Sequence, residues 1–204
     1  MIKNIEFICS GNKDRSPTAQ GYAELVLSKN RIYEVKIISS GTQVDIAKKF
    51  DEFDELDDLN LREFVLPYIP TASNNGFISE EEAEKIKEGI EIRPIIKRIV
   101  GIFLKKSEEY RKKIVEEKSY LAPYLINHSP NQTIVRPQTE LILPISKGNL
   151  ERTIKIYENT NKKPWIELLA DISDPFPSDY GMYKNTLERV ESAVLNKLKE
   201  IYEF

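Results

Sequence analysis

One short segment of the chain, C-S-G-N-K-D-R-S-P over residues 9–17, carries a thiol and a guanidinium on either side of a tight turn. An apolar run of residues 5–8 precedes it, and a helical pattern over residues 19–28 follows it. Free N–H groups at a helix start point outward, and the helix dipole there favours negative charge, so such a loop can bind an anion. The segment therefore predicts a phosphate-binding loop that begins with the nucleophilic thiol of Cys9.

The residue types within this loop suit an anion site. Gly11 carries no side chain where the backbone must approach a ligand, and Asn12 tolerates left-handed geometry. Arg15 can make a two-pronged charged contact with phosphate oxygens. The same positive surroundings favour the reactive thiolate form of Cys9. Ser16 can either donate a hydrogen bond to that thiolate or cap the helix.

A second reactive group follows a later strand. Residues 165–170 read as a strand, and Asp174-Pro175 lies just beyond its carboxyl end. If this strand runs parallel to the first strand, residues 2–8, both strand ends fall on one edge of the sheet, where folds of this class bind ligands. Proline disfavours helical geometry at Asp174 and can project its carboxyl group into a crevice. Asp174 is therefore the predicted general acid and base.

These groups together predict hydrolysis of a phosphate monoester in two steps. The Cys9 thiolate attacks phosphorus and forms a phosphocysteine intermediate, while Asp174 protonates the leaving oxygen and later activates water. No metal or other cofactor is needed, and a single His and a single Cys are too few for a usual zinc site. The residues predicted to surround the phosphate are Ser10, Gly11, Asn12, Lys13, Asp14, Arg15 and Ser16.

Several segments of the chain resemble the low-molecular-weight protein tyrosine phosphatase family. The resemblance covers residues 1–43 and about 139–204, in the family's order, and it does not cover the middle of the chain. The matching segments are the loop at residues 9–17, S-S-G-T at 39–42, T-E-L-I-L at 139–143 with N-L at 149–150, and D-I-S-D-P-F at 171–176.

The resemblance implies a fold and a set of roles. The fold is an α/β, doubly wound sheet of four parallel strands in the order 2-1-3-4, with the active site at the switch between strands 1 and 3. The activity is that of a cysteine-dependent protein-tyrosine phosphatase with Asp174 as its general acid. Phe176 would flank the ring of the substrate, and Tyr180 is a second candidate for this substrate wall.

Two positions depart from the family pattern. Many relatives carry a second Cys just before the Arg, which protects the nucleophile by forming a disulfide. Here that position is Asp14, so this redox switch is absent. Lys13 replaces a small or apolar residue, and a cation there would favour acidic substrates. The Asp14 carboxylate opposes thiolate formation unless it points outward or pairs with Lys13; alternatively, the two form a solvated pair of little influence.

Three other classes of protein use similar loops. Thioredoxin-coupled arsenate reductases need further cysteines, whereas this chain has only Cys9. Phosphatases of the RNA polymerase C-terminal tail have a related loop but lack a proline after the acid, so Asp174-Pro175 favours the tyrosine phosphatases. A catalytically silent module that binds phosphopeptides is the third alternative, and the retention of Cys, Arg and Asp together speaks against it.

The composition excludes further classes. The 204 residues carry a net charge of −3, with no global sign of nucleic-acid or membrane binding. The single Cys excludes an internal disulfide framework, and the first residues lead into a strand without the pattern of a secretory signal. We therefore expect one domain over residues 1–204 in the cytoplasm, acting on phosphorylated proteins or small aryl phosphates, with its oligomeric state open.

Strands that alternate with helices at both ends of the chain also predict an α/β fold. Trp165 is assigned to the core. The expected strands are residues 2–8, 33–39, 141–145 and 166–170, and the first helix is 16–28. The last helix, residues 180–202, has an apolar stripe at helical spacing, formed by Leu187, Val190, Val194, Leu198 and Ile201.

Residues 44–138 form a largely helical insertion that the resemblance does not explain. An acidic run covers residues 51–58, Ser79 marks a helix start, and residues 94–118 read as a long basic helix. The insertion is either a helical cap with solvated charged faces or a lid that selects a partner. His128 is assigned to the surface of a loop rather than to the reaction.

Overall fold

The computed structural model describes residues 2–45, 62, 65–66, 69–74, 76–90, 92–161, 163–175 and 179–204. The acidic run at residues 51–58 lies outside this described part. The single domain expected over residues 1–204 stays a prediction. Two compact units divide the chain: the first comprises Met1–Asp45, Arg111–Asp174 and Lys184–Phe204, and the second Ile46–Tyr110 and Pro175–Tyr183.

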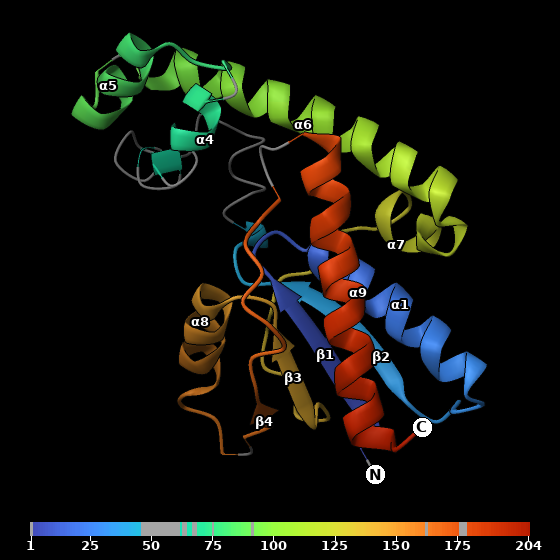
Figure 1. The fold of residues 1–204 in the computed structure, drawn as a ribbon. Coiled ribbons are helices and arrows are strands. Elements are labelled where there is room, and N and C mark those ends of the chain that lie inside the picture. Colours follow the sequence, from blue (N-terminus) through green and yellow to red (C-terminus); the bar gives the residue numbers. More distant parts are fainter. Residues whose placement is uncertain are drawn as a thin grey trace. The chain divides into compact units, whose positions relative to one another are not determined.

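The first unit is built on a four-stranded parallel sheet, shown in Figure 1. Its strands lie in the order β2-β1-β3-β4, which confirms the predicted α/β topology. Because all strands are parallel, their carboxyl ends meet at one edge, and Cys9 pairs there with Gly41. The strands are β1 (Asn4–Cys9), β2 (Lys36–Gly41), β3 (Leu141–Pro144) and β4 (Trp165–Ile166).

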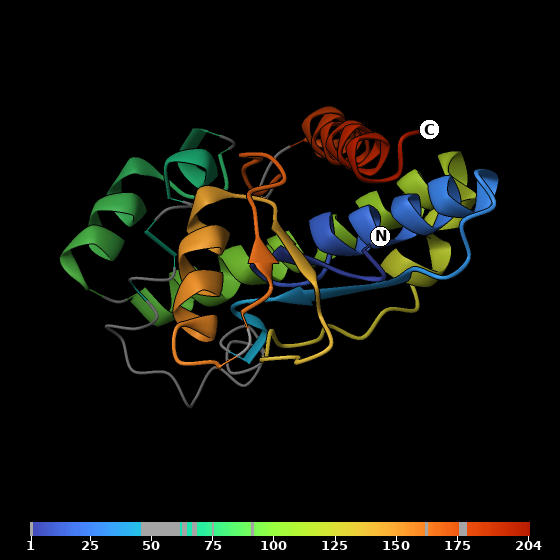
Figure 2. The same ribbon diagram turned by 90° about the horizontal axis from the view of Figure 1, so that it is seen from below.

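Side chains of β1 alternate between the two faces of the sheet, and because both faces carry apolar side chains, helices cover both. Ile5, Phe7 and Cys9 pack in one core with α1 (Arg15–Lys29) and α9 (Tyr180–Tyr202). Figures 1 and 2 show α9 passing across the sheet. On the other face, Ile8 packs in a smaller cluster with residues of β3 and of α8 (Lys147–Tyr157). The predicted stripe of α9 is confirmed, since Leu187, Val190, Val194 and Leu198 are fully buried and Ile201 packs, partly buried, against the same core.

The last strand is shorter than predicted but its path continues along β3. Only Trp165–Ile166 pair with β3 as a strand. The chain therefore still reaches the carboxyl edge of the sheet, just before Asp174. The continuing hydrogen bonds, 2.9–3.0 Å long, run from the amides of Glu167, Leu169 and Ile172 to the carbonyls of Ile142, Pro144 and Ile145.

The assignment of Trp165 to the core is wrong. Its side chain lies at the edge of the sheet and is 57% exposed. The ammonium group of Lys197 lies 5.7 Å from the centre of the indole ring, a cation–π contact that shields part of it. An aromatic residue at an edge strand can thus be solvated on one face and still have a partner.

The described part of the insertion is largely helical, as predicted. The second unit holds α4 (Ile69–Asn74), α5 (Glu80–Glu88) and most of α6 (Ile92–Glu117), whose apolar side chains form a core of their own. The helix start predicted at Ser79 is a capping box, because Ser79 and Glu82 each accept a hydrogen bond from the other's backbone amide. Among the described residues, no helix is long and apolar enough to cross a membrane.

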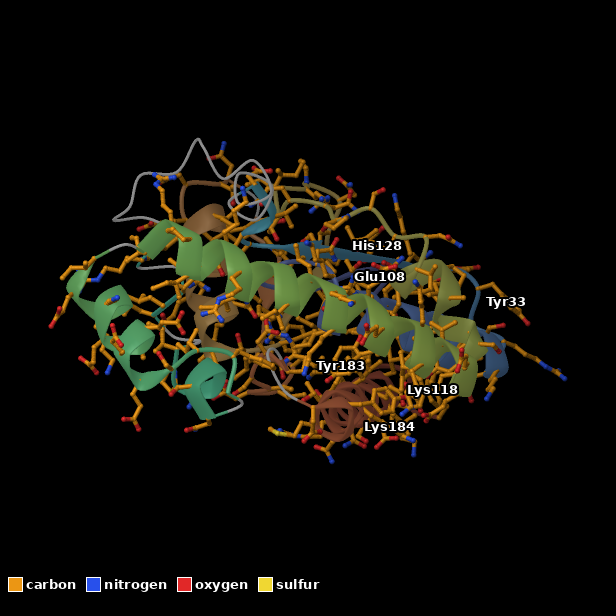
Figure 3. All side chains as sticks on the ribbon, turned by 90° about the horizontal axis from the view of Figure 1, so that it is seen from above. Tyr33, Glu108, Lys118, His128, Tyr183 and Lys184 are labelled. Carbon is orange, nitrogen blue, oxygen red and sulfur yellow. The ribbon has the colours of Figure 1, made fainter. Side chains whose placement is uncertain are left out.

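The end of α6 returns to the first unit and is tied there to α9. Lys118 pairs with Glu191 at 2.6 Å, and Lys184 of α9 pairs with Glu117 at 2.5 Å. Figure 3 labels both lysines. Two short helices follow, namely η2 (Ser119–Leu121) and α7 (Ala122–Leu125).

The insertion then runs back beside β2. The amide of Gly41 donates to the carbonyl of Asn131, and the amide of Thr133 donates to the carbonyl of Gly41, each at 2.9 Å. Gly41 and Gln132 form an isolated parallel bridge. This return places residues 128–132 beside the end of the strand that adjoins β1.

Candidate active site

The loop between β1 and α1 curls over the sulfur of Cys9. The amide of Asn12 donates to Cys9 Sγ at 3.2 Å, and Ser16 Oγ lies 3.0 Å from the same sulfur. Asn12 makes this curl with a φ of 50°, the left-handed geometry expected from its residue type. Cys9 is only 2% exposed, so its sulfur sits among donors rather than in open solvent. The arrangement can hold a thiolate.

Ser16 lies inside α1 and does not cap it. Its hydroxyl donates to the carbonyl of Ser40 at 3.1 Å and accepts from Asn12 Nδ2 at 3.0 Å. A hydroxyl has one proton, so Ser16 can donate either to Ser40 or to Cys9 Sγ. Donation from Ser16 to the Cys9 thiolate, the first of the two roles expected for this residue, stays a prediction.

The side chain of Asn12 is held from the far end of the insertion. Its Oδ1 accepts hydrogen bonds from the amide of Asn131 at 2.7 Å and from His128 Nε2 at 2.8 Å. Burial lowers the pKa of His128 below its ordinary value, and the Arg111 charge lowers it further, while the contact with Asn12 opposes both. His128, labelled in Figure 3, does lie in a loop, as assigned, but it is half-buried and contacts Asn12 in the loop between β1 and α1.

The end of β2 supports the loop from the side. The amide of Thr42 donates to the carbonyl of Cys9 at 3.0 Å, and that of Gln43 donates to the carbonyl of Ser10 at 2.9 Å. A Cβ at Gly41 would lie 2.5 Å from the carbonyl oxygen of Ser10 and 2.7 Å from the amide nitrogen of Asn12. Gly41 is therefore required for the close approach of two backbones.

Ser10 and Gly11 differ in how the protein restrains them. Ser10 Oγ accepts from the buried side chain of Asn149 at 3.1 Å, and Asn149 is oriented by Ser146 Oγ at 2.7 Å. A Cβ at Gly11 would meet only Lys13 Cγ, at 4.0 Å, among the described residues. The predicted reason for Gly11, close approach to a ligand, stays a prediction. Asn149 belongs to the N-L segment, residues 149–150, that resembles the phosphatase family. No feature of the sequence indicates its hydrogen bond to Ser10.

Arg15 and Asp174 lie together at the carboxyl edge of the sheet. Arg15 is 3% exposed, and its guanidinium donates to the carbonyl of Ile172 at 2.9 Å and to Asp174 Oδ2 at 2.6 Å. The Asp174 side chain is 32% exposed, so it lies between the buried guanidinium and solvent. Such a charge-assisted contact is short and directional. The thiol ends β1 and the guanidinium begins α1, on either side of the same loop, and the carboxyl group of Asp174 contacts the guanidinium.

Asp14 also has a partner, but one that the sequence does not indicate. Its two carboxylate oxygens accept from Arg111 Nε at 2.8 Å and from Arg111 Nη2 at 3.1 Å. The side chains of this bidentate pair are 13% and 18% exposed. The sequence predicts for this carboxylate only an outward direction or a pair with Lys13. Because Asp14 is paired with Arg111 of α6, the negative charge of its carboxylate is compensated beside the loop.

The substrate wall is the part of the predicted site that stays a prediction. Phe176 lies outside the described residues. Tyr180 belongs to the second unit, where its ring centre lies 5.6 Å from that of Tyr110. Among the described residues, no cluster of His, Cys, Asp and Glu could hold a metal ion.

Comparison with solved structures shows a shared fold. Wzb from Vibrio vulnificus in complex with benzylphosphonate matches with a TM-score of 0.56 and 16% identity, over 98% of this chain and 99% of that one. The tyrosine phosphatase Wzb from Escherichia coli K30 in complex with sulphate matches at 0.54 and 18% identity, over 98% and 99%. A low-molecular-weight protein tyrosine phosphatase from T. tengcongensis matches at 0.54 and 14%, over 97% and 99%. No family model and no curated protein sequence matches the chain.

Proposed function

We propose that the protein hydrolyses phosphate monoesters through a phosphocysteine intermediate, and that its substrates are phosphotyrosine-containing proteins. One observation carries the proposal: the Cys9 sulfur lies under a loop amide and beside a hydroxyl, in the loop whose Arg15 meets Asp174. The shared fold supports it, since the structures that match include tyrosine phosphatases. The reaction needs a reduced thiol, which fits action in the cytoplasm.

Substrate binding in this scheme begins with an exchange of partners at Arg15. The contact of Nη1 with the carbonyl of Ile172 orients the guanidinium, and Nη2 is the group that Asp174 occupies. A phosphate dianion takes over Nη2, because it offers two charged oxygens to a planar fork. Asp174 is then released beside the bound substrate, and in this scheme it enters the first step protonated.

In the first chemical step Cys9 Sγ attacks phosphorus, opposite to the leaving oxygen. The S–P bond forms as the P–O bond breaks, and Asp174 gives its proton to the departing oxygen. Backbone amides of the loop and the Arg15 guanidinium stabilise the equatorial oxygens in the transition state. Each such donor is worth about 100-fold or more in rate.

The second step reverses the role of the carboxyl group. Asp174, now ionised, takes a proton from water, and the hydroxide attacks phosphorus as the S–P bond breaks. The amide of Asn12 and the hydroxyl of Ser16 receive the returning thiolate, since both lie within hydrogen-bonding distance of Cys9 Sγ. Inorganic phosphate leaves, and Arg15 regains Asp174.

Hydrolysis of aryl phosphates tests the proposal. Wild type, Cys9→Ser, Arg15→Ala and Asp174→Asn are compared on p-nitrophenyl phosphate, phenyl phosphate and a phosphotyrosyl peptide. We expect near-complete loss for Cys9→Ser and Arg15→Ala. Asp174→Asn should lose roughly 100-fold or more on phenyl phosphate and less on p-nitrophenyl phosphate, whose good leaving group needs little protonation.

Other outcomes would redirect the assignment. If Asp174→Asn keeps the wild-type rate on phenyl phosphate, Asp174 is not the acid. If wild type binds the phosphotyrosyl peptide without turning it over, the protein is a phosphopeptide-binding module. Faster hydrolysis of phosphoseryl than of phosphotyrosyl peptides would place it with phosphatases of other phosphoproteins.

A further inference from the structure

Asp14 occupies the N-cap position of α1 but does not cap the helix. Asp at this position ordinarily accepts a hydrogen bond from an amide of the first helical turn. Here its backbone has φ −130° and ψ −67°, and its side chain makes no capping hydrogen bond. The carboxylate is instead engaged by both donors of the Arg111 fork. The Asp14 carboxylate therefore binds Arg111 instead of the amides of the helix that it precedes.

The direction of the Asp14 carboxylate matters because the amides at the start of α1 are the groups that a phosphate needs. The first amides of a helix have no intrahelical acceptors, and an anion bound there gains from the helix dipole. Asp14 adjoins Arg15 in the chain, so its carboxylate is an anion tethered beside those same amides. Left unrestrained, it would cap α1 and compete with the substrate. Its charge would also repel a phosphate dianion.

The geometry of the pair with Arg111 opposes both the capping of α1 by Asp14 and the repulsion of a phosphate dianion. The two hydrogen bonds, at 2.8 and 3.1 Å, fix the direction of the carboxylate as well as its distance. With side chains only 13% and 18% exposed, the pair is little screened by salt. Arg111 also supplies a full positive charge, which cancels that of Asp14 near the loop.

We propose that Arg111 is a positioning residue for the reaction: it holds the Asp14 carboxylate away from the amides of α1 and neutralises it, so that the loop can bind a phosphate dianion. The inference deepens the proposed function and rests on it. It also gives the insertion a role, because Arg111 lies in α6. Removal of Arg111 should therefore weaken phosphate binding only when Asp14 is present with its carboxylate.

Binding of inorganic phosphate, measured by titration calorimetry, tests this inference without requiring turnover. The variants are Arg111→Gln, Asp14→Ala and the double variant, with Lys113→Gln as a control that removes one positive charge from an exposed position of the same helix. Arg111→Gln should weaken phosphate binding roughly tenfold or more. The double variant should regain affinity to within about threefold of wild type, and Lys113→Gln should match wild type. In hydrolysis, Arg111→Gln should raise KM more than it lowers kcat.

Rescue separates this role from a purely structural one. If the pair only supports the fold, Asp14→Ala and the double variant bind phosphate as poorly as Arg111→Gln, and the inference fails. Wild-type affinity in Arg111→Gln overturns it as well. If wild type hydrolyses aryl phosphates in either of these cases, the proposed function survives alone. If wild type binds phosphate but hydrolyses nothing, the proposed function fails, and the calorimetric comparison still decides the role of Arg111.

Discussion

Asn12 shows how one residue can serve both the shape and the support of a loop. Its backbone supplies the left-handed turn, with φ 50°, and its amide faces Cys9 Sγ. Its side chain links Ser16 on one side with Asn131 and His128 on the other. Because Asn12 is fully buried, its loss leaves polar partners without hydrogen bonds.

Two substitutions at this residue separate geometry from hydrogen bonding. Asn12→Gly and Asn12→Ala lose the same side-chain hydrogen bonds, but only Ala is strained at this φ. We expect the free energy of unfolding of Asn12→Ala to be lower than that of Asn12→Gly by about 1 kcal/mol. Urea denaturation measures the difference. Equal stabilities would show that the left-handed turn is not retained when Asn12 is replaced.

At the scale of elements, the site depends on how closely β2 approaches the loop. The strand ends at Gly41, whose backbone lies against the carbonyl of Ser10 and the amide of Asn12. On its other side, Gly41 pairs with the returning insertion through Asn131 and Thr133. A glycine held from both sides cannot retreat, so any added side chain must displace the loop.

Gly41→Ala should therefore damage the site more than its size suggests. The new methyl group would lie 2.5 Å from the carbonyl oxygen of Ser10. This oxygen belongs to the backbone, so it cannot move aside as the end of a flexible side chain can. We expect a loss of about 1–3 kcal/mol in stability and at least a tenfold loss of kcat/KM, measured by denaturation and by aryl phosphate hydrolysis. Gly148→Ala is the matched control, because its Cβ would meet Arg152 at an ordinary 3.6 Å. Comparable losses in both variants would contradict this account.

Over the whole molecule, sequence patterns predicted local structure better than contacts between distant segments. The loop and the final helix were predictable because their signals lie in neighbouring residues; α9 spans Tyr180–Tyr202, as its apolar period indicates. Arg111 and His128 were not found, since they meet the loop across 97 and 116 residues of chain. No local period marks such pairs. The exposure of Trp165 was missed because an edge strand reads like an inner one.

A buried ion pair joins the sheet to the end of the insertion. Glu6, fully buried in β1, accepts from Arg136 at 2.5 Å and from Ser40 Oγ at 2.5 Å. Burial raises the pKa of Glu6 above its ordinary 4.5, although Ser40 and Arg136 act in the opposite direction. The same Ser40 accepts a hydrogen bond from Ser16 through its carbonyl, so this pair supports the floor of the site.

The raised pKa predicts a pH dependence of stability with a definite sign. Between pH 4.5 and the higher folded-state pKa of Glu6, the folded protein binds more protons than the unfolded chain, so the free energy of unfolding falls as pH rises. Glu6→Gln should remove this part of the slope, as measured by urea denaturation across pH 4–8. Glu140→Gln is the contrasting control. Hydrogen bonds from the amides of Lys3 and Asn4 lower the pKa of Glu140, so its stabilisation is lost as pH falls below 4.5.

Removal of the cation tests the same pair from the other side. Arg136→Ala leaves the buried carboxyl group of Glu6 without its charged partner inside the sheet, at a cost of about 3–5 kcal/mol. Glu6→Gln combined with Arg136→Ala should cost less than Arg136→Ala alone, because a neutral amide at this position needs no counter-charge. Denaturation at pH 7 compares the two. If the double variant is the less stable one, Arg136 acts through its packing and not through the charge of Glu6.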